Sequence, residues 1–130
     1  MSNENFETLK ALIVDDQEDS RELLREMLSQ IGLVDVSESA DGEDALRRID
    51  EEDKFFDIVI CDWNMPAMTG VELLRQIRAV HQDMPFLMVT GRQDMSSVVE
   101  AKESGVTAYI GKPFTIEQLE AKIRISCAKK

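Results

Sequence analysis

Four short apolar runs along the chain each end at a polar residue. Continuous apolar runs of this length predict strands that are buried on both faces of a parallel sheet. Parallel strands bring their carboxyl ends to one edge, and an open α/β sheet binds its ligand at that edge, so we expect these polar residues to meet there. The four junctions are Leu12–Val14 before Asp15 and Asp16, Ile58–Cys61 before Asp62, Phe86–Val89 before Thr90, and Tyr109–Gly111 before Lys112.

Apolar residues at helical spacing separate these runs, so strand and helix alternate five times. The first helix is predicted to turn one face inward and to end at Gly32, and a short strand follows at Val34 and Val36. The third strand is predicted at about Asp57 to Cys61, and Pro85 opens the fourth. The inward positions expected on the first helix are Leu23, Leu24, Met27, Leu28 and Ile31.

The later helices begin at polar starts. Asp41-Gly42 opens the second helix, Thr69-Gly70 opens the third, and Thr115 to Gln118 has the capping-box spacing of the last. The fourth helix, about Met95 to Glu103, is weakly patterned. Its expected buried positions are Met95, Val98, Val99 and Ala101. Five βα units with right-handed crossovers predict a five-stranded parallel sheet with helices on both faces.

The composition narrows the class of protein. A chain of 130 residues is expected to form a single domain, 1–130. The net charge of −11 argues against a nucleic-acid surface and against adsorption to anionic membrane; it serves either solubility or the choice of basic partners. No apolar stretch approaches the ~18 residues that span a bilayer, and the N-terminus lacks a signal peptide. A cytoplasmic location is therefore expected, with Cys61 as a small buried thiol.

The polar strand ends predict a cation site. Asp15 and Asp16 are adjacent and must point in different directions, and Asp62 comes from another strand. Like charges brought together without a cation repel and raise each other's pKa. Mg²⁺ suits such a site, because it takes few direct carboxylates and keeps several waters. Each acid alone could equally be a helix cap or a solvated loop residue; the set of three with a lysine is what favours the metal.

The same edge suits phosphoryl chemistry. Lys112 can act as a point-charge clamp on phosphoryl oxygens, and Thr90 can donate a hydroxyl hydrogen bond. The chain has no phosphate-binding loop of the G-x-x-x-x-G-K-[ST] type. The one histidine, His81, lies in a polar loop and is expected at the surface, so no Ser/His/Asp or Cys/His set is available.

These residues together resemble the receiver domain of bacterial response regulators. The motifs are Asp15-Asp16, Asp62 to Pro66, Thr90, Tyr109 and Lys112 to Phe114. The resemblance runs from about Leu9 to Cys127 and is greatest to the stand-alone chemotaxis regulators of the CheY type. It implies a flavodoxin-like α/β fold with strand order 2-1-3-4-5 and five helices on both faces.

The resemblance also implies a role for each residue. Asp62 would be the phosphoacceptor for a sensor histidine kinase or phosphotransfer protein. Asp16, Asp62 and the Asn64 backbone carbonyl would ligate Mg²⁺, with Asp15 acting through a metal-bound water. Lys112 and Thr90 would hold the phosphoryl oxygens. Tyr109 would be the aromatic switch that turns inward when Thr90 moves. The resemblance further implies a cis peptide bond between Lys112 and Pro113.

The implied output is a conformational signal to a protein partner. The family's output surface is the fourth helix, fifth strand and fifth helix, which here carries Gln93, Asp94, Glu100, Lys102 and Glu103. A monomer that is not an enzyme, apart from slow loss of its own phosphate, is expected. Gln17-Glu18-Asp19 after the acidic pair departs from the motor-binding pattern, so a flagellar target does not follow.

Two other functions are compatible with parts of the pattern. A phosphohydrolase of the haloacid-dehalogenase type also uses Mg²⁺ and an aspartyl phosphate, but it needs a second acid two residues after the nucleophile, where this chain has Asn64. Alternatively, the chain is one domain of a longer regulator with a separate output domain. Met1 and the Lys129-Lys130 ending favour a complete protein, but a chain cut at a domain boundary would look similar, so both alternatives stay open.

Overall fold

The computed structural model describes residues 6–52, 56–91 and 95–128. The chain ends Met1 and Lys129-Lys130 lie outside the described residues, as do Gln93 and Asp94. The strands are β1 Lys10–Val14, β2 Asp35–Ser39, β3 Ile58–Asp62, β4 Phe86–Thr90 and β5 Ala108–Gly111. The helices are η1 Phe6–Thr8, α1 Glu18–Gln30, α2 Gly42–Glu52, α3 Gly70–Val80, α4 Met95–Glu103 and α5 Ile116–Ala128.

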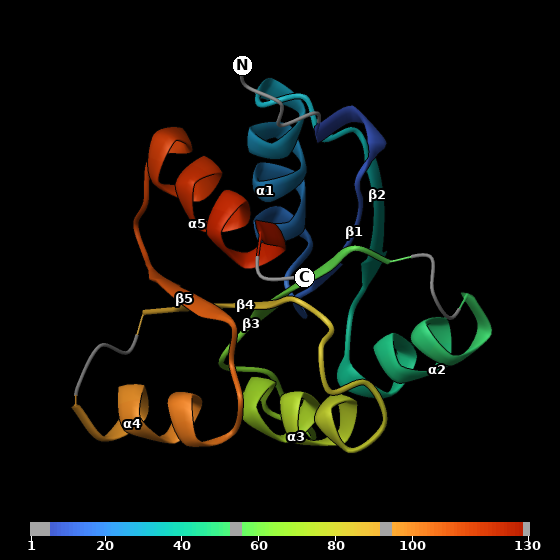
Figure 1. Ribbon diagram of the computed structural model, residues 1–130, viewed down its shortest axis with the longest axis vertical. Coiled ribbons are helices and arrows are strands. Elements are labelled where there is room, and N and C mark those ends of the chain that lie inside the picture. The colour runs from blue at the N-terminus through green and yellow to red at the C-terminus, as the bar shows by residue number, and fades with distance from the viewer. Residues whose placement is uncertain (1–5, 53–55, 92–94, 129–130) are drawn as a thin grey trace.

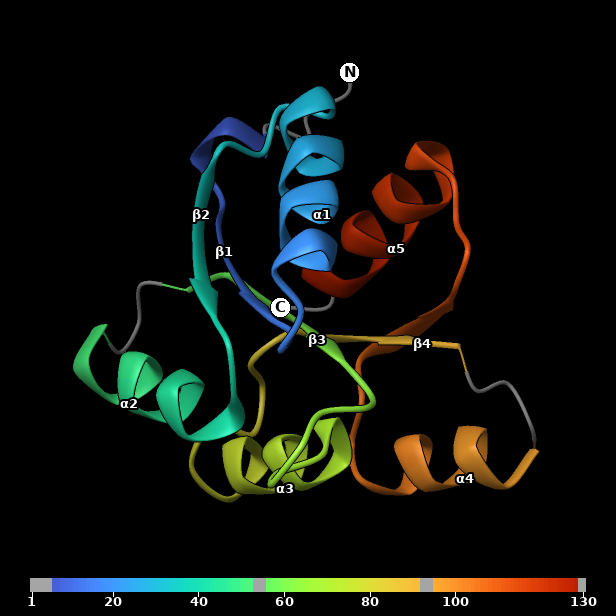
Figure 2. The same cartoon turned by 180° about the vertical axis from the view of Figure 1, so that it is seen from behind.

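All five strands are parallel and form one sheet in the order β2-β1-β3-β4-β5, as the resemblance implies. Figures 1 and 2 show the two helical layers: α1 and α5 cover one face, and α2, α3 and α4 cover the other. The predicted α/β fold with helices on both faces is confirmed. The order brings β1, β3 and β4 together in the middle of the sheet, where their carboxyl ends meet.

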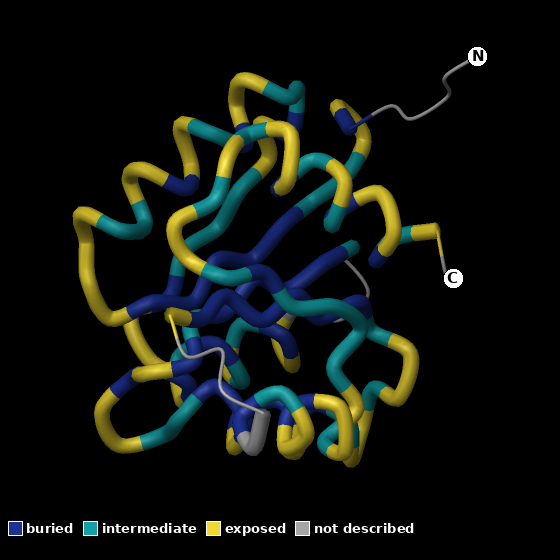
Figure 3. The backbone as a smooth tube through the Cα atoms, turned by 90° about the vertical axis from the view of Figure 1, so that its left-hand side faces the viewer, coloured by how far each residue is buried: buried dark blue, intermediate teal, exposed yellow. Residues whose placement is uncertain are grey.

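The core has two apolar layers, one on each face of the sheet. Alternation along β1 sends Leu12 and Val14 into the layer under α2 and α3, and sends Ala11 and Ile13 into the layer under α1 and α5. All four side chains are completely buried, as the continuous apolar run predicts. Figure 3 shows this buried central layer inside a more exposed ring of helices and loops. The strand ends are therefore rigidly placed.

The predicted helix starts are observed. Thr69 caps α3 through a reciprocal capping box with Glu72. Thr115 and Gln118 exchange the same pair of hydrogen bonds ahead of α5, at 2.9 and 3.1 Å. Asp41 Oδ1 accepts a hydrogen bond from the N–H of Asp44 at the start of α2. These local signals need only a few neighbouring residues, which explains why the sequence carries them.

Two predicted burial positions, Leu23 and Val99, and one predicted strand residue, Val34, are wrong. Leu23 is 60% exposed, because the buried stripe of α1 runs through Leu24 and Leu28 and Leu23 lies beside it. Val34 is exposed and precedes β2, which begins only at Asp35. Val99 is 40% exposed, because α4 packs through Ala101 and Val99 lies on the opposite side of the helix. The side chain of Met95 lies outside what the structure describes.

His81, which was expected at the surface, directly follows α3 as its C-cap and is only partly exposed. Within the described residues, no helix combines the length and the apolar character needed to cross a membrane.

Candidate functional site

The turn after β1 is held by hydrogen bonds on both sides of Asp15. The Asp15 N–H donates to the Ser39 carbonyl at 3.1 Å, which extends the β1–β2 pairing by one residue. Asp15 Oδ1 accepts from the N–H of Gln17 at 2.9 Å, and the Asp15 carbonyl accepts from Arg21 Nη1 at 2.7 Å. Asp15 is 8% exposed, whereas Asp16 points to solvent. The adjacent acids thus differ in environment, as the strand geometry requires.

Asp62 closes β3 and forms an ion pair with Lys112, which follows β5. Lys112 Nζ lies 2.9 Å from Asp62 Oδ1. The Asp62 side chain is 11% exposed and that of Lys112 is 41% exposed, so the ammonium covers the carboxylate from the solvent side. The Lys112-Pro113 peptide bond is cis, as predicted. Two strands that are not neighbours in the sheet therefore contribute to one charged pair.

Asp15, Asp16 and Asp62 form one acidic cluster. One carboxylate oxygen from each lies within 4.8 Å of those of the other two. Burial raises the pKa of Asp15, and the Asp62 and Asp16 carboxylates raise it further, against the Gln17 N–H and the Lys112 ammonium, which lower it. Three oxygen donors at this spacing, one of them destabilised as an anion, fit a hard divalent cation such as Mg²⁺. The predicted convergence of the three acids is confirmed.

The loop between β3 and α3 is pinned against the end of β3. The Gly70 N–H donates to the Trp63 carbonyl at 2.9 Å, and the Trp63 N–H donates to the Val89 carbonyl at 2.9 Å. Gly70 packs so closely that a Cβ there would lie 2.6 Å from the Asp62 carbonyl oxygen. Asn64, the predicted carbonyl ligand, is exposed within this loop. Gly70 was expected only as a helix start, because close approach of backbones leaves no periodic signal.

Thr90 and Tyr109 lie on the same face of the sheet. Thr90 of β4 pairs with Gly111 of β5, and Met88 pairs with Tyr109. Thr90 and Met88 are two residues apart on β4 and so point to the same face, and Tyr109 shares that face with its partner Met88. Thr90 is 3% exposed, and its carbonyl accepts a hydrogen bond from the Lys112 N–H at 2.8 Å. Tyr109 is half-buried and packs against the layer under α2 and α3. The Lys122 ammonium of α5 lies 5.5 Å from its ring centre.

A cleft of about 400 Å³ opens beside the acidic cluster. Asp15, Asp62 and Lys112 line it together with apolar side chains of α1 and the segment after β5. The apolar members from those two segments are Leu23, Leu24, Met27, Pro113 and Phe114. Leu23 is exposed because its side chain lines this cleft. Asp62 also lines the cleft, so its carboxylate can be reached from solvent although the residue is largely buried.

Cys61 is a structural thiol next to the site. It is completely buried in β3, and burial together with the Asp62 and Asp15 charges raises its pKa well above the ordinary value. A thiol that stays protonated is a poor nucleophile, so its proximity to Asp62 gives it no reactivity. This agrees with its predicted role.

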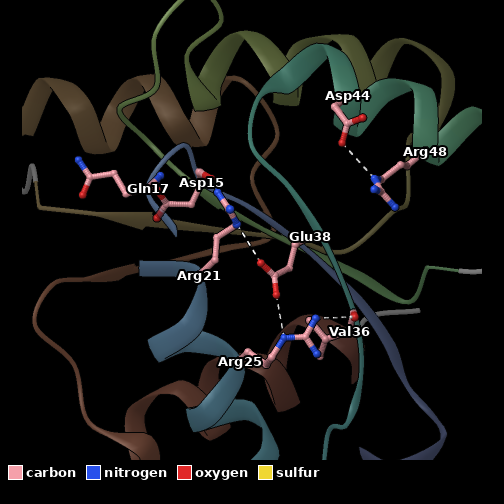
Figure 4. Close-up of polar contacts among 8 residues, drawn as sticks. All are labelled: Asp15, Gln17, Arg21, Arg25, Val36, Glu38, Asp44 and Arg48. Carbon is pink, nitrogen blue, oxygen red and sulfur yellow. Dashed lines mark hydrogen bonds and ion pairs between the residues drawn. The ribbon is translucent and has the colours of Figure 1, made fainter. Parts of the chain in front are cut away.

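Two interactions at the site were not predicted. Arg21 of α1 contacts both the Asp15 carbonyl and the Glu38 carboxylate of β2 (Figure 4). In the sequence, Arg21 and Glu38 are ordinary charged residues on predicted amphipathic elements. An arginine one turn into the helix that follows an acidic pair is the only local signal, and it does not identify the partner.

Comparison with known proteins agrees with the site. A family model described as the response regulator receiver domain matches residues 11–124. The chemotaxis protein CheY of Pseudomonas aeruginosa is 39% identical over 117 residues, which are 88% of this chain and 93% of that protein. The chemotaxis protein CheY-3 of Vibrio cholerae is also 39% identical, over 88% of each chain.

Solved structures share the fold. The Vibrio cholerae chemotaxis protein CheY4 superposes with a TM-score of 0.82 at 32% identity, over 92% of this chain and 98% of that one. A response regulator receiver domain protein from Clostridium thermocellum gives a TM-score of 0.86 at 26% identity, over 93% and 95% of the two chains. Fold and strand order define a CheY-like protein of the flavodoxin type. The chain belongs to the response regulator receiver family of two-component systems.

Proposed function

We propose that Asp62 accepts a phosphoryl group in a Mg²⁺-dependent reaction, from a sensor histidine kinase or a phosphotransfer protein. The observation that carries the proposal is the meeting of three groups at Asp62: a carboxylate pair from β1 and an ammonium from the segment after β5. Phosphoryl transfer needs mainly positioning and charge neutralisation, which this arrangement supplies.

The reaction follows from these positions. An Asp62 oxygen forms the new bond to phosphorus while the P–N bond of the donor's phosphohistidine breaks, and the electron pair of that bond returns to the imidazole nitrogen. The Lys112 ammonium, already 2.9 Å from Asp62 Oδ1, is placed to pair with an incoming phosphoryl oxygen. The cleft lined by Asp62 and Lys112 gives the donor its route to the carboxylate.

Asp16, Asp62 and the Asn64 carbonyl are proposed to hold Mg²⁺ directly, with Asp15 acting through a water. The residues fit the ion because all the donors are oxygens and the carboxylates repel each other without it. When bound, Mg²⁺ neutralises the acids and stabilises the charge of the phosphoryl oxygens. The binding is expected to be weak and reversible, because few protein ligands are supplied.

The proposed output is a switch through Thr90 and Tyr109. The Thr90 hydroxyl is drawn towards the phosphoryl oxygens, and Tyr109 rotates into the space beside it on the same face of the sheet. The half-buried Tyr109 ring at the surface of β5 can make this move without crossing the core. The two states are expected to differ by a few kcal/mol, with phosphorylation shifting their populations.

The α4–β5–α5 face is proposed to carry the signal to a protein partner. Glu100, Lys102 and Glu103 are exposed on α4. The similarity to the chemotaxis proteins CheY and CheY-3 favours a chemotaxis partner. We further propose that the protein acts in the cytoplasm as a monomer and is not an enzyme, apart from slow loss of its own phosphate.

Incubation with a small-molecule phosphodonor and Mg²⁺ tests the proposal. Intact mass spectrometry should show the addition of one phosphoryl group to the wild type. Asp62→Asn should abolish it, and Asp16→Ala should reduce it severely by weakening metal binding. Asp50→Asn, the same change at an exposed position of α2, is the control and should behave as wild type. Full phosphorylation of Asp62→Asn would refute the assignment.

Turnover of small phosphomonoesters separates this function from a phosphohydrolase. A receiver should lose only its own phosphate, slowly, and should release no excess inorganic phosphate from such esters. Multiple turnovers that depend on Asp62 would favour the hydrolase instead.

A further inference from the structure

Arg21 bridges β2 and the acidic turn. Its side chain is only 16% exposed, and its guanidinium donates from Nη1 to the Asp15 carbonyl at 2.7 Å and from Nε to Glu38 Oε1 at 2.8 Å (Figure 4). These two bonds use different nitrogens of one planar fork, so the position of Glu38 determines where Nη1 points. Arg21 thus connects the backbone of Asp15 to a second strand.

The residue that precedes α1 does not cap the helix with its own side chain. Gln17 is the residue before α1, and its side chain makes no capping hydrogen bond. Three hydrogen bonds of Asp15 hold the turn instead. The Asp15 N–H donates to the Ser39 carbonyl, the Asp15 carboxylate accepts from the Gln17 N–H, and the Asp15 carbonyl accepts from the Arg21 guanidinium. Asp16 lies between two residues that these bonds hold in place. The direction of its carboxylate therefore depends on the Asp15 peptide.

Glu38 is held in place from the other side as well. Arg25 Nε donates to Glu38 Oε2 at 2.7 Å, and Arg25 Nη2 donates to the Val36 carbonyl at 3.2 Å. Burial alone would raise the pKa of Glu38, but the hydrogen bonds from Arg25 and Arg21 outweigh it and lower the pKa. Glu38 is thus ionised at neutral pH and orients Arg21 continuously.

We infer that Arg21, oriented by Glu38, is a positioning residue for the cation site, which acts by fixing the Asp15–Asp16 backbone. The inference rests on the proposed function, because it takes Asp16 and Asp62 as the metal ligands. Arg21 contacts the carbonyl of Asp15 and not its carboxylate, so its effect is on geometry. A partner that orients a metal ligand typically changes metal affinity by 10- to 100-fold when removed.

Arg25 provides a matched control. It lies one turn further along α1, shares Glu38 with Arg21 and is also hydrogen-bonded to backbone of β2. Within the described part of the chain, its hydrogen bonds go to Glu38 and to the Val36 carbonyl, and none goes to Asp15. Removing Arg25 thus perturbs the same helix and the same carboxylate without releasing the turn.

The experiment is a titration with Mg²⁺ alone, followed by the fluorescence of Trp63, the chain's one tryptophan. Trp63 directly follows Asp62 and is 8% exposed, so its signal reports on the site. For Arg21→Ala we expect the Mg²⁺ midpoint to rise about tenfold, with the same signal change at saturation. Arg25→Ala should shift the midpoint far less, because Arg21 and its two hydrogen bonds to Glu38 and the Asp15 carbonyl remain. Hydrogen exchange of the Gln17 amide should quicken in Arg21→Ala only.

Arg21→Lys separates geometry from charge, and it is the second variant in case Arg21→Ala fails to fold, because it keeps the charge and the aliphatic stem. A lysine lacks the planar fork and cannot hold Asp15 and Glu38 in the same arrangement, so its midpoint should stay above wild type. A wild-type midpoint in Arg21→Lys would overturn the inference. So would equal shifts in the Arg21→Ala and Arg25→Ala variants.

The failure of the inference is distinguishable from that of the proposed function. If the wild type shows no response to Mg²⁺, the cation site itself is wrong and the inference falls with it. If the wild type binds Mg²⁺ and Arg21→Ala binds it equally well, only the positioning role is refuted.

Discussion

Gly70→Ala is a small change that should damage both stability and the site. Gly70 begins α3 and faces the end of β3. A Cβ there would lie 2.6 Å from the Asp62 carbonyl oxygen, 2.9 Å from Met88 Sδ and 3.1 Å from Trp63 Cα. The first two distances are below the 3.0 Å that Cβ contacts keep in folded proteins. Met88 can adjust, but the Asp62 carbonyl belongs to the sheet and cannot.

The cost follows from which part must move. The Gly70 N–H donates to the Trp63 carbonyl at 2.9 Å, so retreat of α3 stretches that bond. Inserting one methyl group into a packed site costs about 1–3 kcal/mol. Alanine gains at most about 1 kcal/mol over glycine in helix propensity, and less at a helix start. We therefore expect a net loss of about 1–2 kcal/mol in the free energy of unfolding.

Urea unfolding followed by Trp63 fluorescence measures this loss, and the rate of phosphorylation at saturating Mg²⁺ measures the effect on Asp62. We expect a lower urea midpoint with unchanged slope, and slower phosphorylation. Gly91→Ala is the control for stability, because a Cβ at Gly91 meets nothing within 4 Å. If Gly70→Ala is as stable as wild type and is phosphorylated at the normal rate, the close approach of Gly70 to the Asp62 carbonyl does not constrain the fold or the site, and the reasoning is refuted.

Three further outcomes are expected. Asp15→Asn should weaken Mg²⁺ binding and should raise the urea midpoint at neutral pH. The midpoint rises because the pKa of Asp15 is raised in the fold, which means that its ionised form destabilises the folded protein. The gain in stability should shrink as the pH falls through that pKa, because Asp15 is then protonated in the wild type as well. Arg78→Ala should cost about 2–3 kcal/mol in urea unfolding without changing the Mg²⁺ midpoint, since it removes bonds to the Gly105 and His81 carbonyls and the Thr107 hydroxyl, far from the site. Thr90→Ala should leave phosphorylation of Asp62 largely intact. NMR spectra of the free and the phosphorylated Thr90→Ala protein should then show no difference around Tyr109.

The order of apolar and polar positions was sufficient to predict the main features of the site. An apolar run that ends in an acid predicts both a buried strand and the end at which the acid lies. For this reason Asp15, Asp16 and Asp62 could be placed together without coordinates, and the structure confirms it. Lys112 was placed at the same edge by the same reasoning, and its ion pair with Asp62 is observed.

Burial on the helices was predicted less well, because a helix pattern gives a stripe but not its edges. On α1 the pattern could not tell whether Leu23 or only Leu24 faces the sheet, and the answer depends on the cleft beside α1. On α4 the adjacent Val98 and Val99 could not be ranked. Only the crossing of α4 over the sheet decides that Ala101 is buried while Val99 is exposed.

Three kinds of pattern depend only on neighbours a few residues apart: polar positions at strand ends, capping boxes and apolar alternation. The sequence by itself therefore determined the strands, the helix starts and the edge of the sheet that carries the acids. The contacts that adjust this edge depend on residues far apart in the chain. Glu38 reaches Arg21 only because β2 lies beside β1, and Gly70 must be glycine only because α3 begins against the last carbonyl of β3. Tertiary structure alone decided these contacts, because no local pattern records the distance between two backbones.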